Sequence, residues 1–155
     1  MSRTVIHGLQ GLRALAGTTH GPTEWITVGQ DRVDAFAACT GDAQWIHIDA
    51  ERAASSRFGG TLVHGFLTLA LIPSLWHGYF DVRGIETAIN AGLDRVRFPA
   101  PLIAGTRIRA RFHIMEATES GNGLRLVDRV TIEAEGSAKP VCVADQIRFY
   151  RGAAS

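Results

Sequence analysis

The segment that most constrains the fold is residues 65–72 (GFLTLALI), which is apolar on nearly every side. A helix that is hydrophobic around its whole circumference has to be buried on all sides. We therefore expect other elements of the chain to wrap around this helix. Pro73 follows directly, and a proline there either kinks the helix or begins its last turn.

The second half of the chain has the period of β-strands. Between residues 107 and 115 every second residue is apolar, namely Ile108, Ala110, Phe112 and Ile114. Such alternation is typical of an antiparallel strand with one buried face. Residues 124–135 and 141–149 repeat the pattern, and residues 89–98 form an earlier strand that ends at Pro99. Gly121-Asn122-Gly123 predicts a hairpin turn after the first of these alternating strands.

The first half has helical periodicity instead. Apolar spacing predicts three helices, over residues 5–15, 30–40 and 50–57. Gly17 and Gly41 are expected to end the first two helices, and the Asp49 carboxylate is expected to cap the third. Residues 25–27 resemble a short strand, and residues 42–49 interrupt the periodicity.

Helices followed by strands predict an α+β protein in which an antiparallel sheet curls around the apolar helix. The length of 155 residues predicts a single domain spanning 1–155, with residues 1–23 as an N-terminal helical extension. A sheet of this kind has exposed edges, and edges commonly pair with a second copy. We therefore expect a homodimer.

Composition excludes several classes of partner. The formal net charge is only +1, which gives no reason to expect a nucleic acid or a membrane surface. The longest apolar run, residues 66–76, is shorter than the ~20 residues that a membrane span needs. The first residues lack the long apolar region of a secretory signal, and Cys39 and Cys142 make no disulfide framework. A cytoplasmic protein without a metal site is expected, because the remaining histidines have no neighbours at metal-ligand spacing (His7, His20, His77 and His113).

The break at residues 42–49 contains the strongest candidate for chemistry. Asp42 and His47 stand five residues apart, beside Trp45 and Ile46, which exclude water. A carboxylate and an imidazole at such a place can orient one water molecule, and histidine titrates near neutral pH. Alternatively, Asp42 only caps a turn and His47 is a satisfied core histidine.

A second candidate is Gly65, which opens the apolar helix after His64. The first amides of a helix have free N–H groups at the positive end of the helix dipole. A glycine there lets a ligand carbonyl approach closely and suits a developing oxyanion. Tight packing alone is an equally good explanation for a glycine at position 65. His64 is expected to be structural.

These stretches together resemble a known family. TGDAQWIHIDAERA and FGGTLVHGFLTLALIPSL are similar to the hydratase signature of MaoC-like dehydratases, which include R-specific enoyl-CoA hydratases. AINAGLDRVRFPAPLIAGTRIRA and GSAKPVCVA are similar to the branch of the nodulation protein N-like proteins. The resemblance covers most of the chain beyond residue 25, and it implies a hot-dog fold whose copies pair.

The resemblance also implies an activity. Asp42 and His47 would activate water for syn addition to a trans-2-enoyl-CoA, giving (R)-3-hydroxyacyl-CoA, and the same site would catalyse the reverse dehydration. The backbone amide of Gly65 would hold the thioester carbonyl. No metal or redox cofactor is implied, because the thioester of CoA or of an acyl carrier is itself the substrate.

One position departs from the pattern. Some R-specific hydratases have an assisting serine on the central helix, where this chain has Pro73, with Ser74 one step beyond. Two rival functions remain open: thioester hydrolysis and non-catalytic acyl-thioester binding. Arg95, Arg97 and Arg148 are candidates to bind CoA phosphates, although arginines on exposed strands explain the same residues.

Overall fold

A computed structural model describes residues 3–153 of the chain. The strands are β1 (Thr4–His7), β2 (Thr19–His20), β3 (Ile26–Thr27), β4 (Phe80–Arg83), β5 (Ile85–Arg97), β6 (Arg107–Ser120), β7 (Gly123–Ala134) and β8 (Cys142–Gly152). The helices are α1 (Gly8–Arg13), α2 (Gln30–Thr40), α3 (Trp45–Ile48), α4 (Ala50–Ala54), α5 (Gly65–Ala70) and α6 (Ile72–Tyr79). These elements form the α+β architecture that the sequence predicts.

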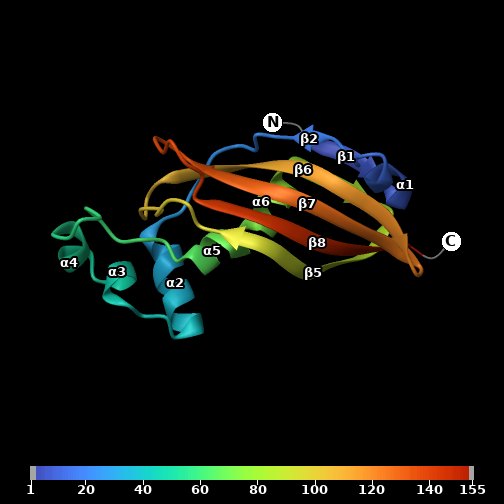
Figure 1. The fold of residues 1–155 in the computed structure, drawn as a ribbon. Helices are drawn as coiled ribbons and strands as arrows, with labels where there is room; N and C mark the ends of the chain where they lie inside the picture. Colours follow the sequence, from blue (N-terminus) through green and yellow to red (C-terminus); the bar gives the residue numbers. More distant parts are fainter. Residues whose placement is uncertain (1–2, 154–155) are drawn as a thin grey trace.

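One large sheet dominates the molecule. Its strand order is β2-β6-β7-β8-β5, with β3 also paired to β6. Neighbours along β5, β8, β7 and β6 are antiparallel. In Figure 1 this sheet arches over α5 and α6, while α2, α3 and α4 gather at one end. A separate pair joins β1 and β4 in parallel.

The alternation in β6 builds the core as predicted. The alternating apolar residues Ile108, Ala110, Phe112 and Ile114 are fully buried. On the other face, Arg109 and Arg111 pair with Glu133 of β7. Behind the sheet, Trp76 of α6 lies with its ring centre 5.2 Å from that of Phe112. The predicted hairpin joins β6 to β7, and Gly121 takes a φ of 56° in it. Within residues 3–153, no helix combines the length and the hydropathy needed to cross a membrane.

The predicted helix over residues 5–15 is wrong in its first part. Val5 and Ile6 belong to strand β1, and helix α1 begins only at Gly8. Gly8 has a φ of +60°, which separates the strand from the helix. The following β2 pairs with β6, so this segment forms an edge of the large sheet and is not purely a helical extension.

The apolar helix is interrupted and only partly covered. It consists of α5 and α6, which meet between Leu71 and Ile72, with Pro73 in the first turn of α6. The expectation that it is buried on all sides is wrong, because Phe66 is 68% exposed. The sheet covers one side of this helix, and the exposed residue Phe66 borders a hollow whose other wall is the terminal strand β5 of the same sheet.

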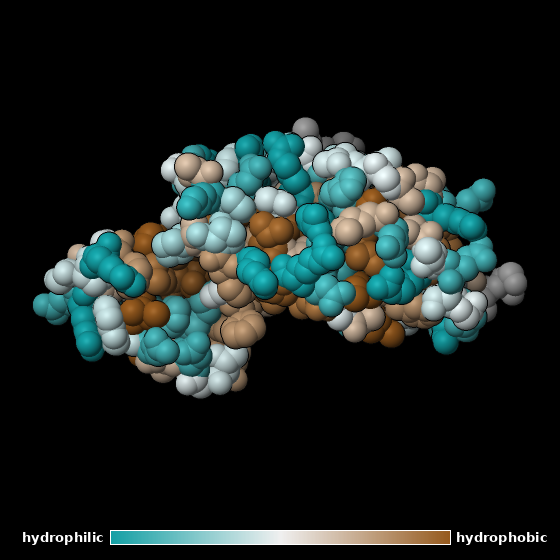
Figure 2. Space-filling model, viewed as in Figure 1, coloured by the Kyte–Doolittle hydropathy of each residue, from teal (hydrophilic) through white to brown (hydrophobic). Residues whose placement is uncertain are grey.

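Strand β5 is the free edge of the sheet. It extends over Ile85–Arg97, longer than the predicted residues 89–98 at its start, and most of its residues are exposed. Its exposed residues include two large hydrophobic side chains, Ile89 and Leu93. Figure 2 shows hydrophobic side chains reaching the surface along β5 and again around α3, where Ile48 is exposed.

Candidate active site

The end of α2 sets the position of Asp42. Gly41 adopts a left-handed conformation with a φ of 77°, and its N–H donates to the carbonyl of Ala37. Glycine is favoured there because a side chain is strained in that region. The chain then leaves the helix, and Asp42 follows as a partly exposed residue.

Helix α3 presents His47. The expected break at residues 42–49 is wrong in part, because Trp45–Ile48 form this short helix. His47 is buried, and its Nδ1 lies 2.7 Å from the carbonyl oxygen of Leu62. A carbonyl only accepts, so Nδ1 carries the proton and donates it. In the neutral form of the His47 ring, Nε2 is then the nitrogen that keeps its lone pair.

Two residues that the sequence analysis did not single out hold α3 in place. The Gln30 side-chain amide donates to the His47 carbonyl at 2.7 Å. The Thr61 hydroxyl donates to the Gln30 side-chain oxygen. The N–H of Leu62 donates to the carbonyl of Ile46 at 2.8 Å. These contacts join α2, α3 and the segment before α5, and no local pattern in the sequence signals them.

His64 lies inside the same site. Its side chain is only 2% exposed, and its Nε2 donates to the backbone carbonyl of Asp42 at 2.9 Å. Its ring stacks on that of His47, with centres 3.7 Å apart and planes 21° apart. Its Nδ1 has no hydrogen-bond partner among the described residues. The sequence predicted only a structural residue, whereas His64 contacts both candidate catalytic residues.

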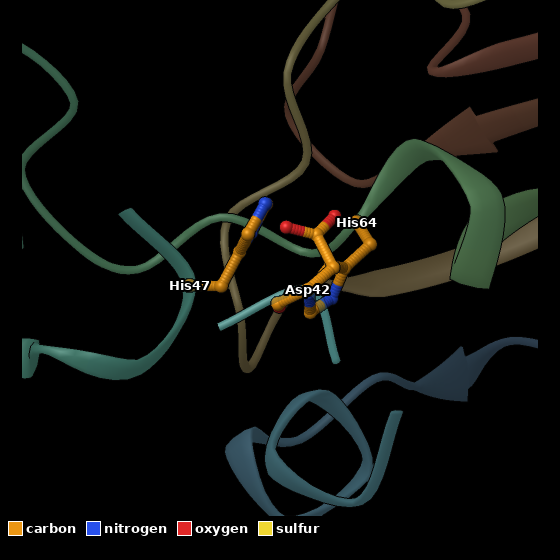
Figure 3. Close-up of side chains that lie close together, drawn as sticks. All are labelled: Asp42, His47 and His64. Atoms are coloured by element: carbon orange, nitrogen blue, oxygen red, sulfur yellow. The ribbon is translucent and has the colours of Figure 1, made fainter. Parts of the chain in front are cut away.

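The three side chains converge. One ligand atom from each of Asp42, His47 and His64 lies within 4.8 Å of the other two. Figure 3 shows the three side chains close together, with the Asp42 carboxylate near both His47 and His64. A spacing of this size leaves room for one water molecule that hydrogen-bonds to both acid and imidazole. Histidine nitrogens with a carboxylate are also zinc ligands, so among residues 3–153 these three form the group able to hold a metal.

A cavity connects His47 to Gly65. It measures about 310 Å³, and its lining includes both residues together with Thr68, Phe98 and Leu102. Gly65 begins α5, as predicted. A Cβ built on Gly65 would lie 3.0 Å from the ring of Phe98, so a side chain there would require that ring to shift. Tight packing therefore explains the glycine, and a role for its amide remains a prediction.

The arginine candidates divide into two groups. Arg148 is wrong as a surface phosphate ligand, because it is buried and contacts Asp128 inside the protein. Arg95 and Arg97 are exposed at the end of β5. The Nε of Arg95 lies 3.9 Å from the carboxylate of Asp145, which holds its charge close to the sheet.

Comparison with known proteins identifies relatives over nearly the whole chain. Residues 12–137 match the family model described as the MaoC like domain. The chain is 49% identical over 140 residues to 3-hydroxyacyl-thioester dehydratase Z of Mycobacterium tuberculosis, covering 90% of this chain and 93% of that protein. It is 42% identical over 138 residues to nodulation protein N of Rhizobium leguminosarum bv. viciae, covering 87% and 86%.

Solved structures share the fold. An unliganded R-hydratase from Pseudomonas aeruginosa superposes with a TM-score of 0.69 at 23% identity, covering 89% of this chain and 83% of that one. The (R)-hydratase from A. caviae superposes with a TM-score of 0.65 at 22% identity, covering 86% and 94%. The predicted hot-dog fold is thereby confirmed. Given the family match over most of its length, the chain belongs to the MaoC-like dehydratase family and is a hydratase or dehydratase, a carbon–oxygen lyase.

Proposed function

We propose that this enzyme adds water to trans-2-enoyl thioesters to give (R)-3-hydroxyacyl thioesters, and catalyses the reverse dehydration. The observation that carries the proposal is the convergence of the Asp42 carboxylate and the His47 imidazole at a spacing that suits one shared water. The named activity of the mycobacterial relative, a 3-hydroxyacyl-thioester dehydratase, supports the same reaction.

The reaction is a paired proton transfer. Asp42 and His47 bind one water molecule, and one or both take a proton from it as its oxygen attacks C3 of the substrate. The electron pair of the double bond moves towards the thioester carbonyl, and C2 then takes up a proton from the same pair. The two groups titrate as a coupled pair, so the proton belongs to the pair and not to one residue. Such a step needs no metal or redox cofactor.

Gly65 is proposed as the carbonyl-binding residue. Charge develops on the thioester oxygen during the attack, and a fixed N–H donor stabilises that charge. The amide of Gly65 belongs to the first turn of α5 and lines the same cavity as His47.

The substrate is proposed to be a thioester of CoA or of an acyl carrier protein. The exposed Arg95 and Arg97 at the end of β5 are proposed to meet its phosphate groups. The working form is proposed to be a cytoplasmic homodimer that binds neither nucleic acid nor a membrane.

Replacing the carboxylate tests the reaction. Asp42→Asn should lower the hydration rate by at least about 100-fold, because the water loses its proton acceptor. The measurement is the loss of enoyl absorbance with crotonyl, octenoyl and dodecenoyl thioesters, with chiral analysis of the product. An unchanged melting temperature of Asp42→Asn would show that the variant keeps its fold.

The matched control is Asp49→Asn, which removes an exposed carboxylate from the same segment. Asp49 caps α4 by accepting from the N–H of Arg52, and asparagine caps equally well. This variant should keep the wild-type rate. Full activity of Asp42→Asn would reject the mechanism, and release of free thiol without loss of the double bond would indicate a thioesterase instead.

A further inference from the structure

Gln30, the first residue of α2, reaches two other parts of the site through its side-chain amide. Its nitrogen donates to the His47 carbonyl at 2.7 Å and to the Asp34 carboxylate, one turn along α2, also at 2.7 Å. Its oxygen accepts from the Thr61 hydroxyl. Both ends of the amide are therefore bonded, and they connect α2, α3 and the segment before α5.

The orientation of this amide is fixed by its partners. A carbonyl and an ionised carboxylate only accept hydrogen bonds, so the end of the amide between His47 and Asp34 has to be the nitrogen. A turned amide would place its oxygen against two acceptors. The donor that faces the His47 carbonyl is thus set by the neighbouring groups of the chain.

Helix α3 depends on such a contact because it is a single turn. It has four residues, and a helix of that length is not stable by itself. The His47 carbonyl lies in this last turn, where the helix supplies no N–H to it. The bond from Gln30 takes the place of the missing donor.

The same contacts determine where the His47 ring lies. Its Nδ1 donates to the Leu62 carbonyl at 2.7 Å, and Leu62 directly follows Thr61, whose hydroxyl bonds to Gln30. Gln30 therefore holds both sides of the Nδ1 bond, namely the backbone that carries the ring and the segment that carries the acceptor. In the neutral ring this bond leaves Nε2 with the lone pair.

We infer that Gln30 is a positioning residue for hydration, whose amide N–H keeps Nδ1 of His47 on the Leu62 carbonyl and so keeps Nε2 available to the shared water. The described residues that line the cavity beside His47 do not include Gln30, so it acts through His47 and not on the substrate. This inference rests on the proposed function, because it takes His47 to bind that water.

The first test is Gln30→Glu, which keeps the size of the side chain and replaces the donor by a group that titrates. The ionised carboxyl has no hydrogen for the His47 carbonyl, and it faces the Asp34 carboxylate, which raises its pKa. Once protonated, it has one O–H to donate. We expect kcat for enoyl hydration to be about 100-fold below wild type at about pH 8 and within about tenfold at about pH 5.5, with KM changed by less than about threefold.

Two control variants separate the hydrogen bond from size and from charge. Gln30→Met has a similar length and no donor, so the ratio of its kcat to that of wild type should be low and independent of pH. Gln44→Glu adds a carboxylate on an exposed residue at the start of α3, and it should show no loss that grows with pH. Melting temperatures verify that each variant folds.

Three kinetic outcomes would overturn the inference. They are a wild-type rate of Gln30→Met, a rate ratio of Gln30→Glu that does not rise as the pH falls, and the same pH response in Gln44→Glu.

The His47 ring gives a readout that does not depend on turnover. NMR of the ring nitrogens distinguishes an Nδ1–H ring from an Nε2–H ring, and the His47 signals are those missing from His47→Gln. At about pH 8, wild type should show the Nδ1–H form and Gln30→Glu a mixture of both forms. The same Nδ1–H form in both proteins would overturn the inference. Absence of enoyl hydration by wild type would instead count against the proposed function, so the two failures are distinguishable.

Discussion

His64 contacts both members of the proposed acid/base pair. Its Nε2–H holds the Asp42 carbonyl, and its ring stacks on His47. His64 hydrogen-bonds neither to the Asp42 carboxylate nor to a ring nitrogen of His47, so we treat it as a positioning residue. A displacement of about 1 Å in a catalytic group can cost on the order of 100-fold in rate.

Two substitutions of His64 distinguish the role of its hydrogen bond from the role of its ring volume. Glutamine carries its amide nitrogen near the place of Nε2 and keeps the donor, whereas asparagine is too short to do so. We expect His64→Gln to keep kcat within about tenfold of wild type and His64→Asn to lower it by about 100-fold. Steady-state kinetics on an enoyl thioester measure both. Equal losses in the two variants would indicate that only ring packing matters.

The burial of Asp128 makes the stability of the protein depend on pH. Burial raises its pKa from 3.8 to about 6, with the nearby Asp145 adding to the shift and Arg148 opposing it. The folded protein therefore holds this proton more tightly than the unfolded chain between pH 3.8 and about 6. The contribution of Asp128 to stability is full below pH 3.8 and is lost as the pH rises through about 6, by roughly 3 kcal/mol.

Asp128→Asn should remove this pH dependence. The free energy of unfolding, measured by urea denaturation from about pH 4 to about pH 7, should rise in the variant relative to wild type across that interval. Only the way in which this difference in unfolding free energy changes with pH tests the raised pKa, because Asp128→Asn also alters the contact with Arg148. Asp49→Asn, at an exposed carboxylate, gives the reference for a surface group. Parallel curves for wild type and Asp128→Asn would contradict the raised pKa.

The sequence identified part of the site for a physical reason. Asp42 and His47 are close along the chain, so their spacing already restricts them to one region, and the structure brings them together. The residues that hold Asp42 and His47 in position lie further away along the sequence. His64 bonds to a carbonyl 22 residues away, and Thr61 bonds to Gln30 across 31 residues. Such contacts depend on the tertiary fold and leave no local pattern.

At the scale of elements, the junction between α2 and Asp42 depends on one backbone conformation. Gly41 has a φ of 77°, and a Cβ added there would meet nothing within 4 Å. Gly41→Ala should therefore destabilise the protein by about 1 kcal/mol through backbone strain alone. Gly41→Asn should cost less, because asparagine tolerates the left-handed region. Thermal unfolding of the two variants measures this, and equal stability of Gly41→Ala and wild type would contradict it.

The strands were predictable wherever one face is buried and the other is polar, as between Ile108 and Ile114. β6 continues to Ser120 beyond that pattern, held by its pairing with β7 near the hairpin. The helix predicted at Val5 and Ile6 is wrong because these residues belong to β1, which pairs with β4 more than 70 residues away in the sequence. Helix α3 has four residues, too few to show a helical period.

At the scale of the whole molecule, the free edge of the sheet and the uncovered side of the central helix lie together. Phe66 of α5 and Ile89 and Leu93 of β5 are exposed hydrophobic side chains along this border. An unpaired strand with apolar side chains is a template for pairing with another chain, and two copies related by a twofold axis satisfy both edges at once. We therefore expect the proposed homodimer to form through β5.

Charged side chains on this edge should separate the copies. The double variant Ile89→Lys, Leu93→Lys places lysines where an antiparallel β5 pair would bring like charges together, and edge lysines oppose such pairing. Sedimentation velocity should show a dimer for wild type and a monomer for this variant. Val5→Lys is the matched control, because Val5 and Leu93 are both 43% exposed but Val5 lies on β1, away from β5. A dimer that survives the β5 substitutions, or that Val5→Lys dissociates, would show that the copies meet through a different surface.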